Sequence, residues 1–130
     1  MQELYHQITI TIVLYNESFD IVNKCLSKVR NFKIIIIDNN NDKILKRKIE
    51  KYFKIYKYII NKKNLGFSKA LNQAIKISDS EYILNLESDC LIDESNILKL
   101  FESLKKYPNS LIVTPTMYSE NGKLTHSGGT

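Results

Sequence analysis

The sequence predicts an α/β fold, with a doubly wound and mainly parallel sheet. Short apolar runs rich in β-branched residues recur along the chain, and segments with apolar residues at helical spacing lie between them. The runs are continuous rather than alternating, which is typical of strands that are covered on both faces. Strands and helices in this order favour right-handed crossovers, with helices on both sides of the sheet.

Five strands are expected. They share an apolar composition and are bounded by polar or turn-forming residues, and we place them at residues 8–14, 33–37, 55–60, 81–86 and 111–114. The last run ends at Pro115, and Asn121-Gly122 further along predicts a hairpin turn.

Four helices are expected between these strands, because apolar residues repeat there every three or four positions. Asp42 and Asp93 are suited to cap the second and fourth helices, and Pro108 ends the fourth. The apolar stripes are Phe19, Val22, Cys25, Leu26 and Val29; Ile44, Leu45, Ile49, Tyr52 and Phe53; Ala70, Leu71, Ala74 and Ile75; and Ile97, Leu98, Phe101 and Leu104.

Length and charge limit the possible classes of protein. The 130 residues form one domain at most, residues 1–130, and the net charge of +5 is carried almost entirely by scattered lysines. A solvated lysine-rich surface explains this charge best, attraction to an anionic membrane or substrate comes second, and nucleic acid comes third.

The cysteines and the N-terminus suggest a cytoplasmic protein. Cys25 and Cys90 are too far from other Cys or His residues to predict a zinc site, and we expect both to be reduced core thiols. Residues 1–7 are polar and no apolar run is long enough to span a bilayer. Peripheral association with the inner face of a membrane remains open.

Several other α/β folds are excluded by missing motifs. The turn after the first strand, residues 15–18, has no glycine, and no P-loop is present. A phospho-receiver domain needs an aspartate at the end of the third strand, where this chain has Asn61-Lys62-Lys63.

Two carboxylates follow the fourth predicted strand, as Glu87-Ser88-Asp89. Residues i and i+2 of an extended segment point to the same side. We therefore expect Glu87 and Asp89 to hold one divalent cation between the protein and an anionic ligand such as a diphosphate.

Four segments of the chain resemble the N-terminal half of a family 2 glycosyltransferase of the GT-A fold. Residues 12–17 contain a Tyr-Asn signature, residues 36–40 an Asp-Asn motif, and residues 82–89 a strand leading into an Asp-x-Asp motif. Residues 64–72 resemble the Asn-x-Gly-Phe…Asn segment of the rhamnosyl- and galactofuranosyl-transferase-like members. The resemblance implies the donor-binding part of such an enzyme, incomplete in this chain.

The resemblance also implies roles for individual residues. Asp89 is the direct ligand of Mg²⁺ or Mn²⁺, and Glu87, in place of the usual Asp, reaches the metal through water or contacts the ribose. Asp38 accepts a hydrogen bond from the base, unless it only ends the strand in an Asx turn. The nucleotide-sugar-binding set is Tyr15, Asn16, Glu17, Asp38, Asn40, Asn64, Gly66, Lys69, Glu87 and Ser88.

Some of these residues have a structural alternative. Tyr15 stacks on the base or packs in the core, and Lys69 approaches a phosphate or is simply solvated. Asn64 and Asn72 serve equally well to lock the loop to the following helix, whereas Gly66 permits a close backbone turn. His126 is not assigned a catalytic role.

The implied reaction is an inverting transfer from a UDP-, GDP- or dTDP-linked sugar to a glycan or lipid-linked acceptor, in polysaccharide or cell-envelope biosynthesis. The catalytic base is expected beyond Thr130, because none of the acidic residues after the metal motif matches the base segment. The alternative is a non-catalytic nucleotide-sugar-binding remnant or interaction module.

Overall fold

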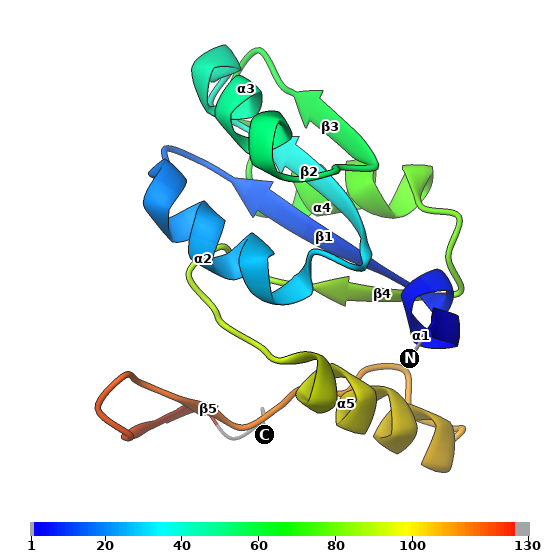
Figure 1. Ribbon diagram of the computed structural model, residues 1–130. Coiled ribbons are helices and arrows are strands. Elements are labelled where there is room, and N and C mark those ends of the chain that lie inside the picture. The colour runs from blue at the N-terminus through cyan, green and yellow to red at the C-terminus, as the bar shows by residue number, and fades with distance from the viewer. Residues whose placement is uncertain (1, 127–130) are drawn as a thin grey trace. The chain divides into compact units, whose positions relative to one another are not determined.

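A parallel four-stranded sheet forms the centre of the larger unit of the chain, Met1–Ile92 (Figure 1). The computed structural model describes residues 2–126, and a second unit comprises Asp93–Thr130. The strand order is β3-β2-β1-β4, in which the strands are β1 (Ile8–Leu14), β2 (Lys33–Asp38), β3 (Lys57–Ile60) and β4 (Tyr82–Asn85).

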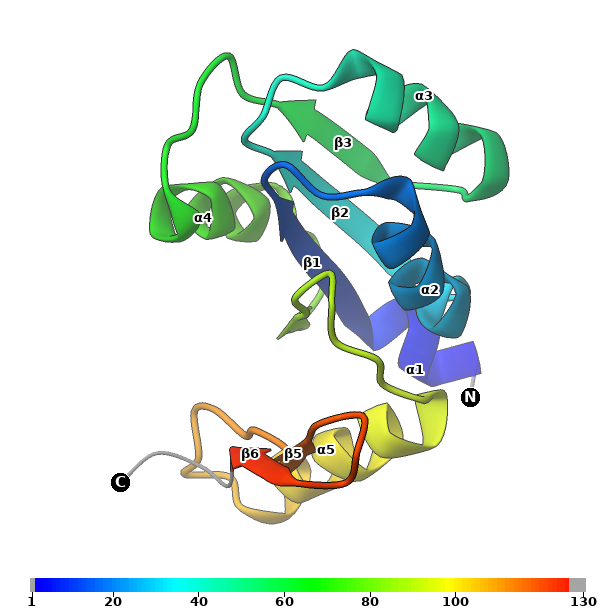
Figure 2. The same cartoon turned by 90° about the vertical axis from the view of Figure 1, so that its left-hand side faces the viewer.

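Helices cover both faces of this sheet, as expected for a doubly wound fold. Figure 2 shows α4 (Phe67–Ile77) on one face, and α2 (Phe19–Val29) and α3 (Lys43–Tyr52) on the other. A short helix that the sequence did not predict, α1 (Gln2–Gln7), precedes β1. The predicted α/β class with parallel strands is confirmed.

One cluster of the core lies between α4 and the central strands on one side of the sheet. Ile35 and Ile37 of β2 pack there against Ala70 and Ala74 of α4, and all four are fully buried. The two alanines present little side chain to the sheet, so the helix backbone can approach it closely. Residues of alternate parity, such as Ile34 and Ile36, are equally buried, which explains the continuous apolar runs.

Side-chain caps fix the starts of two helices. The Asp42 Oδ1 atom accepts a hydrogen bond from the Leu45 N–H at 2.9 Å, which confirms the predicted cap of α3. Ser18 caps α2 in the same way through the Ile21 N–H, at 3.4 Å.

The second unit contains α5 (Glu94–Lys106) and a hairpin of β5 (Met117–Tyr118) and β6 (Leu124–His126). Asp93 is the N-cap of α5 without a side-chain capping bond. Asn121-Gly122 forms the predicted turn of the hairpin, with φ +81° at Gly122.

The prediction of a strand at residues 111–114 is wrong. Leu111 and Ile112 are 92% and 80% exposed, and the segment is not a strand. A strand needs a neighbour for its backbone hydrogen bonds, and among residues 2–126 none pairs with this segment. Within the same residues, no helix combines the length and the apolar character that a membrane span needs.

Candidate functional site

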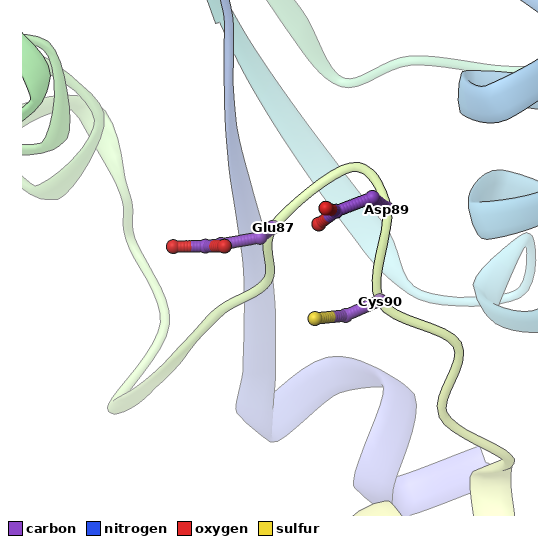
Figure 3. Close-up of side chains that lie close together, drawn as sticks. All are labelled: Glu87, Asp89 and Cys90. Carbon is purple, nitrogen blue, oxygen red and sulfur yellow. The ribbon is translucent and has the colours of Figure 1, made fainter. Parts of the chain in front are cut away.

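The acidic motif lies in a turn rather than in an extended segment. β4 ends at Asn85, and the Cys90 N–H donates a hydrogen bond to the Glu87 carbonyl at 3.0 Å. The strand-parity argument for the convergence of Glu87 and Asp89 is therefore wrong. The turn itself brings the side chains together, and Figure 3 shows Glu87, Asp89 and Cys90 extending to the same side of it.

The ligand atoms of Glu87, Asp89 and Cys90 all lie within 4.8 Å of one another. The two carboxylates are exposed and the thiol is half-buried, so the expectation of a core thiol at Cys90 is wrong. Burial and then the charges of Asp89 and Glu87 raise the pKa of Cys90. Two exposed carboxylates suit a hard divalent cation such as Mg²⁺ or Mn²⁺, and a thiol beside them adds a softer ligand.

The acidic turn contacts α2 through Cys25. Cys25 is 1% exposed, as expected for a core thiol, and its Sγ lies 3.9 Å from the Glu87 carbonyl oxygen. Burial raises the pKa of Cys25 to about 12, with smaller contributions from Cys90 and Asp89. The backbone before the turn is held by a bond from the Leu86 N–H to the Thr11 carbonyl at 2.9 Å.

A pocket of about 160 Å³ lies beside this turn, beyond the carboxyl ends of β1 and β4. Its polar lining combines Glu17 from the loop after β1 with Glu87, Ser88 and Asp89. Three residues of the predicted nucleotide-sugar-binding set and the predicted metal ligand Asp89 thus share one pocket. Ser88 is only 4% exposed, and the apolar lining comes from Val13, Phe67 and Leu86.

Phe67 is the pocket residue that sequence reasoning missed as a site residue. Its ring is 48% exposed at the first position of α4. Phe67 belongs to the Asn-x-Gly-Phe segment at residues 64–72, but that resemblance assigned its ring no contact with a ligand. Exposed aromatic faces at a pocket rim are suited to flat ligand groups.

Asp38 lies at the end of β2, outside the lining of that pocket. Its side chain is 1% exposed, and both of its oxygens accept hydrogen bonds within the chain. The Asn40 N–H donates to Oδ1 at 2.8 Å, and the Tyr58 hydroxyl donates to Oδ2 at 3.1 Å. The first bond forms the Asx turn that was one of the two expectations. Burial raises the pKa of Asp38, against the effect of these two bonds.

Tyr15 and Asn16 follow β1 at the same edge of the sheet. Tyr15 is 54% exposed, so the alternative of core packing is wrong for this residue. Asn16 adopts φ +57° in the left-handed region, which asparagine tolerates better than most residues. Asn40, also in the predicted set, is exposed beside Asp38.

A network of amide side chains, which sequence reasoning missed, fixes the loop before α4. Asn61 donates to Asn39 and exchanges two bonds with Gln73 of α4, at distances between 2.8 and 2.9 Å. Asn39 also donates to the Gly66 carbonyl at 3.2 Å. The run of asparagines in the sequence hinted at such a network, but the pairing depends on contacts between β2, the loop and α4.

Asn64, Gly66 and Lys69 of the predicted nucleotide-sugar-binding set lie in the loop before α4 or on its first turn. Asn64 accepts the Gly66 N–H at 2.8 Å in an Asx turn, and Gly66 adopts φ +84° and ψ +165°. Lys69 is exposed on the first turn of α4. Gln73, rather than the exposed Asn72, locks the loop to the helix. The segment 127–130 that follows His126 lies outside the described residues.

Comparison with known proteins finds chains that are related to this one in sequence. A poly-beta-1,6-N-acetyl-D-glucosamine synthase of Staphylococcus epidermidis is 32% identical over 114 residues, which cover 82% of this chain and 27% of the synthase. An uncharacterized glycosyltransferase of Methanocaldococcus jannaschii is 25% identical over 128 residues, which cover 90% of this chain and 44% of that protein. The chain therefore spans less than half of the length of these relatives.

The fold has solved counterparts as well. The crystal structure of S. aureus TarS 1–349 in complex with UDP-GlcNAc matches with a TM-score of 0.64 at 17% sequence identity, covering 88% of this chain and 38% of that one. The family model described as glycosyl transferase family 2 matches residues 9–128. Because that match includes nearly the whole chain, the protein belongs to glycosyltransferase family 2.

Proposed function

We propose that this chain binds a nucleotide-diphosphate sugar at the carboxyl edge of its parallel sheet and contributes the donor site of a glycosyltransferase. The observation that carries the proposal is the pocket shared by Glu17, Glu87, Ser88 and Asp89. Ligands of open α/β sheets bind beyond the carboxyl ends of the strands, where this pocket lies. Membership of the family supports the same assignment.

The residues of the acidic turn fit a divalent cation. Asp89 is proposed as the direct ligand, and Glu87 as a second ligand, bound directly or through water. Their oxygens and the Cys90 sulfur lie close enough together to surround one ion. When bound, Mg²⁺ or Mn²⁺ neutralises negative charge on a diphosphate leaving group.

Other residues of the chain are proposed to position the donor, with Asp38, at the end of β2, accepting a hydrogen bond from an N–H group of the base. The exposed ring of Tyr15 offers a face on which a base can stack, and Phe67 offers a second apolar surface at the pocket. Asn16, Asn40 and Asn64 lie in the loops at this edge and offer amide groups to the ribose or the phosphates. Lys69 on the first turn of α4 supplies a positive charge for a phosphate.

A uridine diphosphate sugar is the first donor to test. The TarS structure was solved with UDP-GlcNAc and another with UDP, and the S. epidermidis relative is named for an N-acetylglucosamine polymer. Rhamnosyl and galactofuranosyl donors belong in the same panel, because the segment 64–72 resembles enzymes of that kind. The proposed acceptor is a glycan or a lipid-linked saccharide, reached at a membrane surface or in solution.

The test is calorimetry of the full chain with UDP, GDP and dTDP, in the presence and absence of Mn²⁺. We expect nucleotide binding that depends on Mn²⁺. In Asp89→Asn the affinity should fall about tenfold, because this substitution removes the carboxylate that is proposed as the direct metal ligand. Glu81→Gln is the matched control, since Glu81 is exposed at the opposite end of β4. Absence of metal-dependent binding at millimolar nucleotide contradicts the proposal.

A further inference from the structure

Asp38 is closed to ligands in the structure. It is 1% exposed, and each of its oxygens already accepts a hydrogen bond from within the chain. Two donors aimed at one carboxyl group suit its ionised form, which accepts hydrogen bonds and donates none. Any ligand group that binds Asp38 must therefore be a donor, and it must take the place of something that now covers the carboxylate.

The two internal donors differ in how easily they can move. The Asn40 N–H belongs to the backbone of the Asx turn that ends β2, and that turn is fixed further by the bond from the Asn39 N–H to the Leu14 carbonyl at 2.8 Å. The Tyr58 hydroxyl is the tip of a half-buried side chain on β3, at the edge of the sheet. A rotation of the Tyr58 side chain releases Oδ2 and leaves the backbone unchanged.

Tyr58 lies on the same side of the sheet as Asp38. It pairs in register with Ile36, two residues before Asp38, so the side chains of Tyr58, Ile36 and Asp38 share one face. The Lys46 Nζ of α3 lies 5.5 Å from the centre of the Tyr58 ring on that face. The Tyr58 hydroxyl therefore reaches Asp38 along this face of the sheet, near the carboxyl ends of the strands, where Tyr15 is exposed.

We propose that the Tyr58 hydroxyl competes with the base of the nucleotide for Asp38, so that the base binds by replacing the Tyr58 hydrogen bond. This inference rests on the proposed function, because it concerns the same donor site. The base must present an N–H to the carboxylate, as the imide of uracil or thymine and the N1–H of guanine do. Cytosine presents an acceptor at the corresponding ring nitrogen and is disfavoured.

The competition has a consequence with a definite sign. In the free protein, Tyr58→Phe removes a donor from a buried carboxylate, so the free state becomes less stable. In the complex, the base supplies the missing donor and that loss is absent. The variant therefore binds the nucleotide more tightly than the wild type, by about three- to tenfold. A tyrosine that merely holds Asp38 in position for the base gives the opposite result.

Calorimetry of the full chain with UDP and Mn²⁺ tests the inference. We expect tighter binding in Tyr58→Phe and no change in the matched control Tyr56→Phe. Tyr56 also donates its hydroxyl to an aspartate, the exposed Asp79, at 3.3 Å, and lies outside the donor site. With UDP methylated at N3, which lacks the imide N–H, the gain in Tyr58→Phe should disappear.

Other outcomes separate this inference from the proposed function. If the wild type binds UDP with Mn²⁺ but Tyr58→Phe binds it equally or more weakly, the competition is overturned and the donor site stands. If the wild type does not bind UDP or the other nucleotides with Mn²⁺, both are overturned. Should Tyr58→Phe fail to fold, Asp38→Asn replaces it as the test. Its amide can keep both internal partners but turns an N–H towards the imide, so undiminished UDP affinity overturns the inference.

Discussion

Asn61 and Gln73 exchange two side-chain hydrogen bonds, at 2.8 and 2.9 Å, and so join the loop after β3 to the second turn of α4. Asn61 is 8% exposed and also donates to Asn39 at the end of β2. Among the described residues, every buried side-chain nitrogen and oxygen has a partner. A network satisfied in this way fixes the edge of the sheet on which the proposed donor site depends.

The first prediction concerns this pair. Gln73→Ala removes both bonds to Asn61 and leaves the Asn61 Oδ1 oxygen without its donor, so we expect the free energy of unfolding to fall by about 1–3 kcal/mol in urea titrations. Asn72→Ala is the control, since Asn72 is the exposed neighbour of Gln73 on the same helix. Equal losses in the two variants would show that the network adds no stability.

The second prediction concerns the backbone at Gly66. Its φ of +84° and ψ of +165° lie in a region reserved almost entirely for glycine, although a Cβ there would meet nothing within 4 Å. Gly66→Ala should therefore cost about 1–3 kcal/mol of stability through backbone strain alone. Ser68→Ala, at an exposed helical position two residues later, should leave the thermal midpoint almost unchanged.

The third prediction uses Cys90 as a reporter of the metal. Its half-buried thiol lies among the carboxylates of Glu87 and Asp89, so a cation bound there should slow alkylation of Cys90 by iodoacetamide several-fold. Cys25 is the internal control, because it is buried and its pKa is raised to about 12. Asp89→Asn should abolish the protection. If the chain binds Mn²⁺ and UDP but the alkylation rate of Cys90 is the same with and without Mn²⁺, the ion is bound at another site.

The fourth prediction concerns the pH dependence of stability. Burial raises the pKa of Asp38 above its ordinary value of 3.8, so the folded state holds this proton more tightly than the unfolded state. The contribution of Asp38 is therefore greatest below pH 3.8 and declines as the pH rises through the raised pKa.

Asp38→Asn removes this titration and serves as the reference. The free energy of unfolding of the wild type, measured without ligand and relative to Asp38→Asn, should fall as the pH rises from below 3.8 through the raised pKa of Asp38. A relative stability that rises over this range would mean that the bonds from Asn40 and Tyr58 outweigh burial.

The sequence by itself determined the alternation of strands and helices in the larger unit. The β-branched run of β1 and the helical spacing of apolar residues in α2 and α4 lie within single segments. Each of these elements could therefore be predicted without knowledge of its neighbours. The cap at Asp42 and the turn at Asn121-Gly122 were equally legible, because they depend on residues at most three apart. The position of the acidic motif after the fourth strand also follows from the order of the elements.

Only the tertiary structure decided which side chains meet. The pairing of Asn61 with Gln73, the bond from Tyr58 to Asp38 and the place of Cys90 beside the acidic residues depend on the folded path of the chain. The segment 111–114 has the composition of a strand, but a strand also needs a partner for its backbone groups. Local periodicity encodes the preference of a segment, whereas hydrogen-bond partners and burial are set by residues distant in sequence.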